Sequence, residues 1–159
     1  MHLVQRATAH LQAPAGAVFD VLTDIARLPE WNASMLRVVG DVGDLRPGAE
    51  WTIEARALGV TWESHSTVIE FDRATRRFVH RSGPTGPSHV VWTWEVDDED
   101  PGSQVRVTWD LNPRTMRHRF ILLPIRAWLL KRREVPASLR ALDQAALANL
   151  ARRASDGGG

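Results

Sequence analysis

Six short segments of alternating side-chain character, all between residues 35 and 112, constrain the fold of this chain more than any other feature. Turn-forming residues separate them, as in Arg46-Pro47-Gly48 and the run from Gly83 to Pro87. These connections are shorter than the roughly dozen residues that a crossover between parallel strands needs. The sequence therefore predicts antiparallel hairpins, with strands at residues 35–43, 49–58, 60–71, 76–82, 88–97 and 104–112.

Two further elements precede this series. Residues 2–11 alternate in character and predict a seventh strand. Apolar residues then recur at helical spacing and predict a helix over 14–27, which Pro29 ends. Glu30-Trp31-Asn32 is expected to form a short turn or helical piece.

A long helical region follows the strands. It begins at Asn112-Pro113, and Pro124 and Pro136 are expected to kink or break it. One apolar sheet face needs a cover, and this region is long enough to supply it. The order predicts an α+β fold in which a curved antiparallel seven-stranded sheet wraps onto a long C-terminal helix, with a cavity between them. Residues 1–154 are expected to form one domain and 155–159 a flexible tail.

Composition narrows the possible functions. The chain has no cysteine, which excludes disulfides and thiolate sites, and its net charge of +1 gives no general attraction for nucleic acid. The amino terminus lacks the apolar run of a signal peptide, and the longest apolar stretch, residues 120–130, is too short to span a bilayer. We therefore expect a cytoplasmic protein without a cofactor, a nucleic-acid partner or stable membrane insertion. The oligomeric state stays open.

The segment Val60–Val68 indicates what the cavity wall consists of. Read as a strand, it places Trp62, Ser64 and Ser66 on one face. A face that mixes an indole with hydroxyls suits a cavity better than a packed core, because a buried hydroxyl without a partner costs about 1–3 kcal/mol. We expect the following residues to line a ligand cavity: Trp31, Asn32, Trp51, Trp62, Ser64, Ser66, His80, Trp92, Trp94 and Trp109. The competing interpretation is that these indoles only fill the core.

His80 is the leading candidate for proton transfer, with Ser64 as its partner. Alternation with Phe78 points His80 inward, and a neutral imidazole can act as a base or, when protonated, as an acid. The competing interpretation is a merely hydrogen-bonded core histidine. Alternation points His65 and His89 outward, away from His80, so no metal site is expected.

A basic segment, residues 114–133, has two interpretations. It contains seven Lys or Arg residues and no acid, interleaved with large apolar residues. It either forms the lid of the cavity with its charges toward solvent, which we favour, or rests on an anionic membrane surface.

Several local sequences resemble a known superfamily. These are Ala13 through Asp24 followed by Leu28-Pro29-Glu30-Trp31, then Trp62-Glu63-Ser64-His65, His80-Arg81, Val91-Trp92-Thr93-Trp94, and Ser138 through Leu142. Together they resemble the START-like helix-grip proteins, also called the polyketide cyclase/dehydrase and lipid-transport superfamily (SRPBCC). The resemblance covers nearly the whole chain and is nearest to the aromatase/cyclases of aromatic polyketide synthesis.

The resemblance implies a function, and one residue of this chain departs from the pattern of the cyclases. In those cyclases a Trp-x-Ser-x-Arg pattern lines the cavity, and its arginine engages carbonyl or enolate oxygens. Trp62 and Ser64 match this pattern, whereas Ser66 stands in the place of the arginine. The implied function is binding of a hydrophobic, aromatic or polyketide-like molecule by a cofactor-independent cyclase/dehydratase-type enzyme. The alternative is a non-catalytic carrier of a hydrophobic ligand or lipid.

Overall fold

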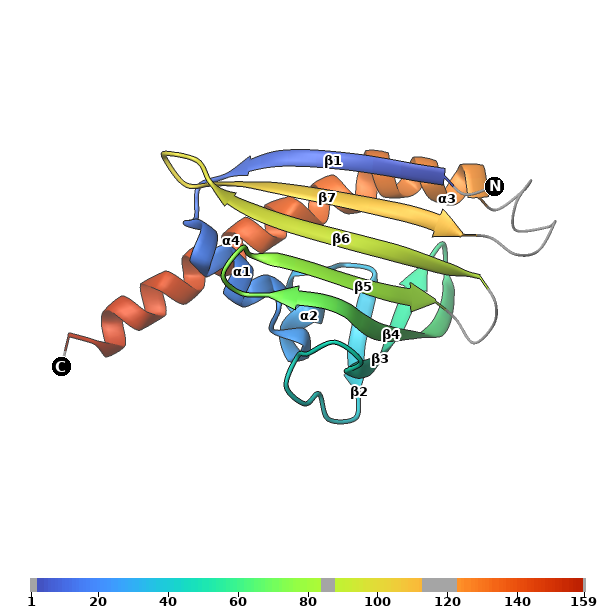
Figure 1. Ribbon diagram of the computed structural model, residues 1–159, viewed down its shortest axis with the longest axis horizontal. Coiled ribbons are helices and arrows are strands. Elements are labelled where there is room, and N and C mark those ends of the chain that lie inside the picture. Colours follow the sequence, from blue (N-terminus) through green and yellow to red (C-terminus); the bar gives the residue numbers. More distant parts are fainter. Residues whose placement is uncertain (1–2, 84–87, 113–122, 159) are drawn as a thin grey trace.

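The computed structural model describes residues 3–83, 88–112 and 123–158, and their strands form one antiparallel sheet. The order across this sheet is β1-β7-β6-β5-β4-β3-β2, so the first strand lies beside the last (Figure 1). The predicted seven-stranded antiparallel sheet is therefore confirmed. The strands are β1 (Leu3–Leu11), β2 (Met35–Val39), β3 (Glu50–Ala57), β4 (Val60–Asp72), β5 (Arg77–Gly83), β6 (His89–Asp98) and β7 (Ser103–Asn112).

One strand and one helix are shorter than expected. β2 ends at Val39, because Gly40 turns the chain with a positive φ of 79°. The helix predicted over 14–27 ends at Leu22, where the Thr23 hydroxyl donates to the Phe19 carbonyl over 2.7 Å. A 3₁₀-helix, η1 (Ile25–Arg27), replaces its last turn. The short helix α2 (Leu28–Trp31) follows, where a short turn or helical piece was expected around Glu30-Trp31-Asn32. Pro29 lies in the first turn of α2, so it begins this helix and does not end the preceding one.

The C-terminal helix runs diagonally across one face of the sheet (Figure 1). It consists of α3 (Leu123–Leu129), a π-helical turn, η3 (Leu130–Glu134), and α4 (Val135–Asp156). The wider turn lies directly before Pro136, which has no backbone N–H to donate. Pro136 thus distorts the helix without ending it. Of the expected start at Asn112-Pro113, Asn112 is the last residue of β7, and Pro113 lies outside the described residues. At the other end α4 continues through Asp156, two residues into the segment 155–159.

Burial explains why this helix covers the sheet. Leu139, Leu142 and Ala146 follow one another along one stripe of α4 and are buried against the core. The same helix packs on α1 (Ala15–Leu22), whose Val18 and Phe19 are also buried. The apolar stripe of α4 and the inward sheet face therefore form one continuous core, as the fold prediction requires.

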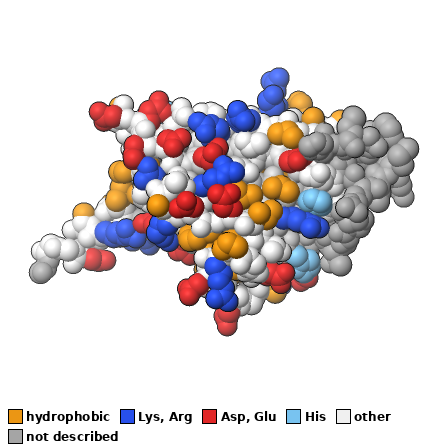
Figure 2. Space-filling view, in the orientation of Figure 1, with side chains coloured by type: hydrophobic (Ala, Val, Ile, Leu, Met, Phe, Trp, Pro, Cys, Tyr) orange, Lys and Arg blue, Asp and Glu red, His pale blue; other side chains and the backbone are white. Residues whose placement is uncertain are grey.

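The opposite face of the sheet is charged and faces solvent. Figure 2 shows acidic and basic side chains interspersed over this face. Arg77 pairs with Glu70 at 3.1 Å and with Glu95 at 2.8 Å, and Arg106 also reaches Glu95 at 3.2 Å. These pairs connect neighbouring strands across the outer face, which leaves the inward face free to carry the aromatic residues.

Candidate functional site

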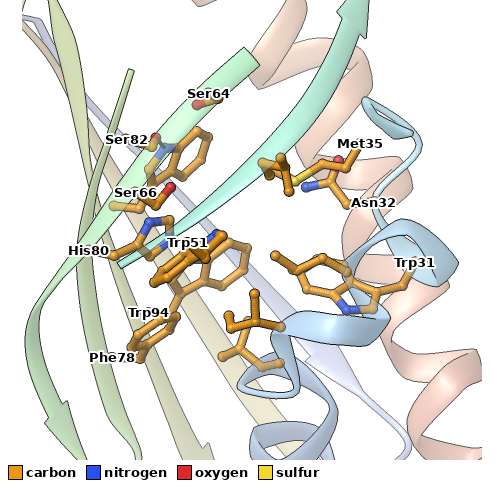
Figure 3. A pocket seen from close by; sticks show the side chains of 15 residues that line it. Trp31, Asn32, Met35, Trp51, Ser64, Ser66, Phe78, His80, Ser82 and Trp94 are labelled. Carbon is orange, nitrogen blue, oxygen red and sulfur yellow. Dashed lines mark hydrogen bonds between the residues drawn. The ribbon is translucent and has the colours of Figure 1, made fainter. Parts of the chain in front are cut away.

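The inward sheet face and the helices enclose a cavity of about 50 Å³. Strands β3 to β6 supply one wall, and the segment from the end of α1 to the start of β2 supplies the other (Figure 3). The lining residues are Leu22, Ile25, Leu28, Trp31, Asn32, Met35, Trp51, Ile53, Ser64, Ser66, Phe78, His80, Ser82, Trp92 and Trp94.

The volume sets a limit on what the cavity holds in this conformation. A water molecule needs about 10–15 Å³ measured in this way, whereas a cavity known to bind benzene has about 150 Å³. A cavity of about 50 Å³ therefore holds a few waters and no aromatic ring. A larger ligand requires the lining side chains to move.

Aromatic rings dominate the sheet wall because register places them side by side. Phe78 lies opposite Trp94, and His80 lies opposite Trp92. The His80 ring lies 5.0 Å from the Phe78 ring and 5.2 Å from the Trp51 ring, measured between centroids. Trp92 stacks nearly parallel to both His80 and Trp94, with interplanar angles of 14° and 16°. The result is a flat-sided apolar surface of the kind on which aromatic molecules stack.

Hydroxyl groups gather on neighbouring positions of β4 and β5. Ser66 lies opposite Trp51 on β3 and opposite Ser82 on β5, and Ser64 lies two residues further along β4. Ser64 and Ser66 are buried, and neither hydroxyl has a hydrogen bond among the described residues. The Ser82 hydroxyl accepts a hydrogen bond from the Trp92 indole N–H at 3.0 Å. Figure 3 shows the three serines together on one side of the aromatic rings, so the sheet wall has a polar and an apolar part.

The helical wall presents Trp31, Asn32 and Met35 toward the sheet (Figure 3). The Trp31 ring meets the Trp94 ring edge to face, with centroids 6.0 Å apart. The Ser34 hydroxyl, in the segment after α2, donates to Glu134 of the C-terminal helix at 3.2 Å, and Arg27 of η1 donates to Asn149 of α4 at 2.8 Å. Up to Trp31 this wall lies outside the sheet ladder, whereas its end is tied to β3, where the Arg56 N–H donates to the Ser34 carbonyl at 2.7 Å and Met35 pairs with Ala55. The part formed by η1 and α2 is therefore the easier one to displace.

Three buried nitrogen atoms around this cavity lack a hydrogen-bond partner. They are Trp31 Nε1, Trp51 Nε1 and His80 Nδ1. Among the described residues these are the only side-chain nitrogen or oxygen atoms that are themselves fully buried and lack a partner, a group that does not include the hydroxyl oxygens of Ser64 and Ser66. Such an atom costs about 1–3 kcal/mol, so buried polar groups are nearly always paired with protein or water. Their concentration on residues of one cavity indicates a place where a ligand or water supplies the missing partners.

Burial also sets the protonation state of His80. Its side chain is only partly exposed, and surrounding protein lowers the pKa of His80 from 6.5 to about 3. The imidazole is therefore neutral at physiological pH. A group with so low a pKa is a weak base, but a neutral imidazole remains able to donate one hydrogen bond and accept another.

Most of the expected ligand-binding residues come together here, and two do not. Trp31, Asn32, Trp51, Ser64, Ser66, His80, Trp92 and Trp94 all line the cavity. Trp62 has the expected face but lies opposite Ala55, beyond Ser64 and outside the lining. Trp109 is fully buried behind Trp92, and its indole N–H donates to Gln5 at 3.0 Å, so it belongs to the core.

Ser82 is a lining residue that the sequence analysis missed. The sequence contained a signal for it, because Phe78, His80 and Ser82 alternate along β5.

His65 lies on the outer face, where its Nδ1 and the Thr52 hydroxyl are 2.9 Å apart, so it is separated from His80 as expected. Residues 114–122 of the basic segment 114–133 lie outside the described residues, and the rest belongs to α3 and η3. Of its described part, Trp128 is 57% exposed, and Lys131, Arg132 and Arg133 face solvent.

A second hollow, of about 330 Å³, lies beside the first. It is lined by the segment Thr23–Ala26, by residues 42–45 of the β2–β3 connection, and by Phe71 and Arg73. Ile25 lines both spaces, so this side chain stands between them.

No helix in the described part of the chain is long and apolar enough to cross a membrane.

Several solved structures have the same fold as this chain. The crystal structure of Ara h 8.0201 is 14% identical, with a TM-score of 0.72 over 93% of this chain and 99% of that one. The Zhui aromatase/cyclase from Streptomyces sp. R1128 is 21% identical, with a TM-score of 0.66 over 100% of this chain and 99% of that one. The di-domain aromatase/cyclase StfQ of the steffimycin pathway is 11% identical, with a TM-score of 0.74 over 95% of this chain and 52% of that one.

These likenesses establish the helix-grip fold that the sequence predicted. A search of curated proteins found no match to the chain. A family model, in contrast, matches residues 2–155, which is nearly the whole sequence. The chain therefore belongs to the family of polyketide cyclase/dehydrase and lipid transport proteins.

Proposed function

We propose that this protein binds a hydrophobic, aromatic or polyketide-like small molecule in the cavity and promotes its cyclisation or dehydration. One observation supports binding above all: three unpartnered buried nitrogen atoms belong to an otherwise aromatic cavity. Stacking on the indoles supplies affinity, and oxygens of the ligand satisfy the nitrogens and the free hydroxyls of Ser64 and Ser66.

Binding requires the cavity to open, and the helical wall is the part that moves. The sheet wall is held by continuous backbone ladders, whereas η1 and α2 are short, and Ile25 of η1 borders both hollows. In this proposal the ligand arrives through the larger hollow and displaces Ile25 and Trp31.

A closed cavity promotes cyclisation by holding a flexible chain folded, so that a nucleophilic carbon meets a carbonyl without further loss of entropy. His80 serves as a neutral hydrogen-bond donor to that carbonyl, because its low pKa makes it a poor base at pH 7. Neutral imidazoles with lowered pKa values polarise carbonyls in other enzymes. Ser64 orients the same oxygen or a water molecule next to it.

Binding is tested by titrating aromatic ligands while following tryptophan emission, together with native mass spectrometry of the purified protein for a retained ligand. Trp51→Phe should weaken binding, since it removes an unpartnered indole N–H. The matched control is Trp128→Phe, because Trp128 is exposed on α3 away from the lining. Unchanged emission with every ligand and no retained molecule would contradict binding.

Catalysis is tested separately by supplying a linear poly-β-ketone thioester and analysing the products. His80→Ala and Ser64→Ala should each change the product distribution relative to the wild type. Thr67→Ala, on β4 but bonded to Glu50 on the outer face, is the control. If both cavity variants give the wild-type distribution, the assigned roles are wrong.

A second candidate function is a non-catalytic carrier of a hydrophobic molecule. It is favoured by the weak basicity of His80 and by the lack of any charged residue among the described lining residues. A carrier binds ligand but leaves the products of the thioester identical to those formed in buffer alone.

A further inference from the structure

The polar groups that the described residues contribute to the cavity are all uncharged near neutral pH. Its described lining contains three serines, one asparagine, indoles and a histidine, and no lysine, arginine, aspartate or glutamate. The histidine adds no charge near neutral pH, because burial lowers the pKa of His80 to about 3. A ligand inside the cavity therefore meets hydrogen-bonding groups but no counter-ion among the residues that the structure describes.

Charged side chains close to the cavity in sequence point elsewhere. Arg81 lies between two lining residues on β5 but faces outward and is exposed. Glu63 and His65 flank Ser64 on β4 and are likewise exposed. At the helical wall the charge next to the cavity is acidic, since Glu134 accepts the hydrogen bond of Ser34. An anion in the cavity would gain no pairing from these groups.

Ser66 occupies a position where a basic residue would place a counter-ion inside the cavity. It is 2% exposed, it lies between Trp51 and Ser82 on the adjacent strands, and its hydroxyl is free among the described residues. A cation at this point would sit beside the aromatic rings at the centre of the sheet wall. A serine there offers only a neutral donor and acceptor.

We propose that the cavity selects uncharged aromatic ligands, such as phenols, aryl ketones and aryl amides, over carboxylates of the same shape, and that Ser66 determines this preference. The inference rests on the proposed binding function. Its physical basis is that burying an ionised carboxylate without a counter-ion is far more costly than burying a neutral group whose hydrogen bonds are made.

The test compares two ligands of nearly identical shape, 2-naphthamide and 2-naphthoate, at pH 7 by ligand-detected NMR titration. The amide should bind at least about tenfold more tightly than the carboxylate, since only the carboxylate carries an unpaired charge. Equal affinities, or tighter binding of the carboxylate, would overturn the charge preference while leaving ligand binding intact. Failure of both ligands and of the wider aromatic panel would overturn the binding function itself, and this inference with it.

The role of Ser66 is tested by Ser66→Lys, which should raise the affinity for 2-naphthoate relative to 2-naphthamide at least about tenfold. Thr67→Lys adds the same charge on the adjacent outward position and should leave the wild-type ratio unchanged. Circular dichroism and thermal melting verify that each variant folds. A folded Ser66→Lys protein with the wild-type ratio would refute the assignment to Ser66, and if this variant does not fold, the wild-type ligand pair still decides the charge preference.

Discussion

Acidification should destabilise the folded protein through His80. Burial lowers the pKa of this residue from 6.5 to about 3, so between these pH values the unfolded chain binds a proton that the folded chain excludes. Stability rises with pH wherever the unfolded state binds more protons. The contribution of neutral His80 is thus complete above pH 6.5 and is lost progressively as the pH falls toward 3.

The size of the stability loss follows from the difference between the pKa of His80 in the folded and unfolded states. Each unit between the pH and the unfolded pKa costs about 1.36 kcal/mol. At pH 5, one and a half units below 6.5, the free energy of unfolding should have fallen by about 2 kcal/mol through His80 alone. This is a large fraction of the roughly 5–15 kcal/mol that stabilises an ordinary domain.

The assay is urea unfolding at pH 7, 6 and 5 for the wild type and for His80→Phe, which keeps an aromatic ring in the stack. Other groups titrate in both proteins, so the difference between their pH dependences isolates His80. If His80→Phe loses as much stability between pH 7 and pH 5 as the wild type, His80 takes up a proton in the folded state and our reasoning on its burial is wrong.

Three further variants test the structure around the cavity. Leu142→Ala removes a fully buried side chain of α4 and should lower the free energy of unfolding by about 2–5 kcal/mol in chemical denaturation. Ser82→Ala leaves the Trp92 indole N–H without its acceptor and should cost about 1 kcal/mol, with a shift in tryptophan emission; an unaltered emission spectrum would mean that the bond does not orient the ring. Ser34→Ala releases the helical wall from Glu134 and should accelerate amide hydrogen exchange at residues 32–35, whereas unchanged exchange would show that this contact does not restrain the wall.

Alternation along the strands made much of the sheet wall predictable. A strand sends successive side chains to opposite faces, so Ser64, Ser66, His80 and Trp94 could be assigned inward from the sequence. The same rule identifies Ser82 once β5 is followed to its end. The helical wall was harder to predict from the sequence. The break after Leu22 depends on Thr23 capping α1 and on Pro29 starting α2, and apolar spacing does not show it.

Alternation along a strand assigns a side chain to one face of the sheet but does not give its position within that face. Trp62 and Trp109 share the inward face with the cavity residues, yet one lies beyond the lining and the other behind Trp92. Which of several inward indoles borders a cavity depends on how strands pair and on where α2 and the C-terminal helix cross the sheet. No pattern within a single strand contains that information.

The sequence by itself determined the sheet, its covering helix, the family and the uncharged character of β4 at Ser66, because period, spacing and residue identity are local properties of the chain. Only the tertiary structure decided that the cavity in this conformation is too small for an aromatic ring, that three buried nitrogens lack partners and that His80 is neutral. These properties arise from atoms contributed by β3 to β6 and by α2 together, and desolvation by such neighbours exists only once the chain has folded.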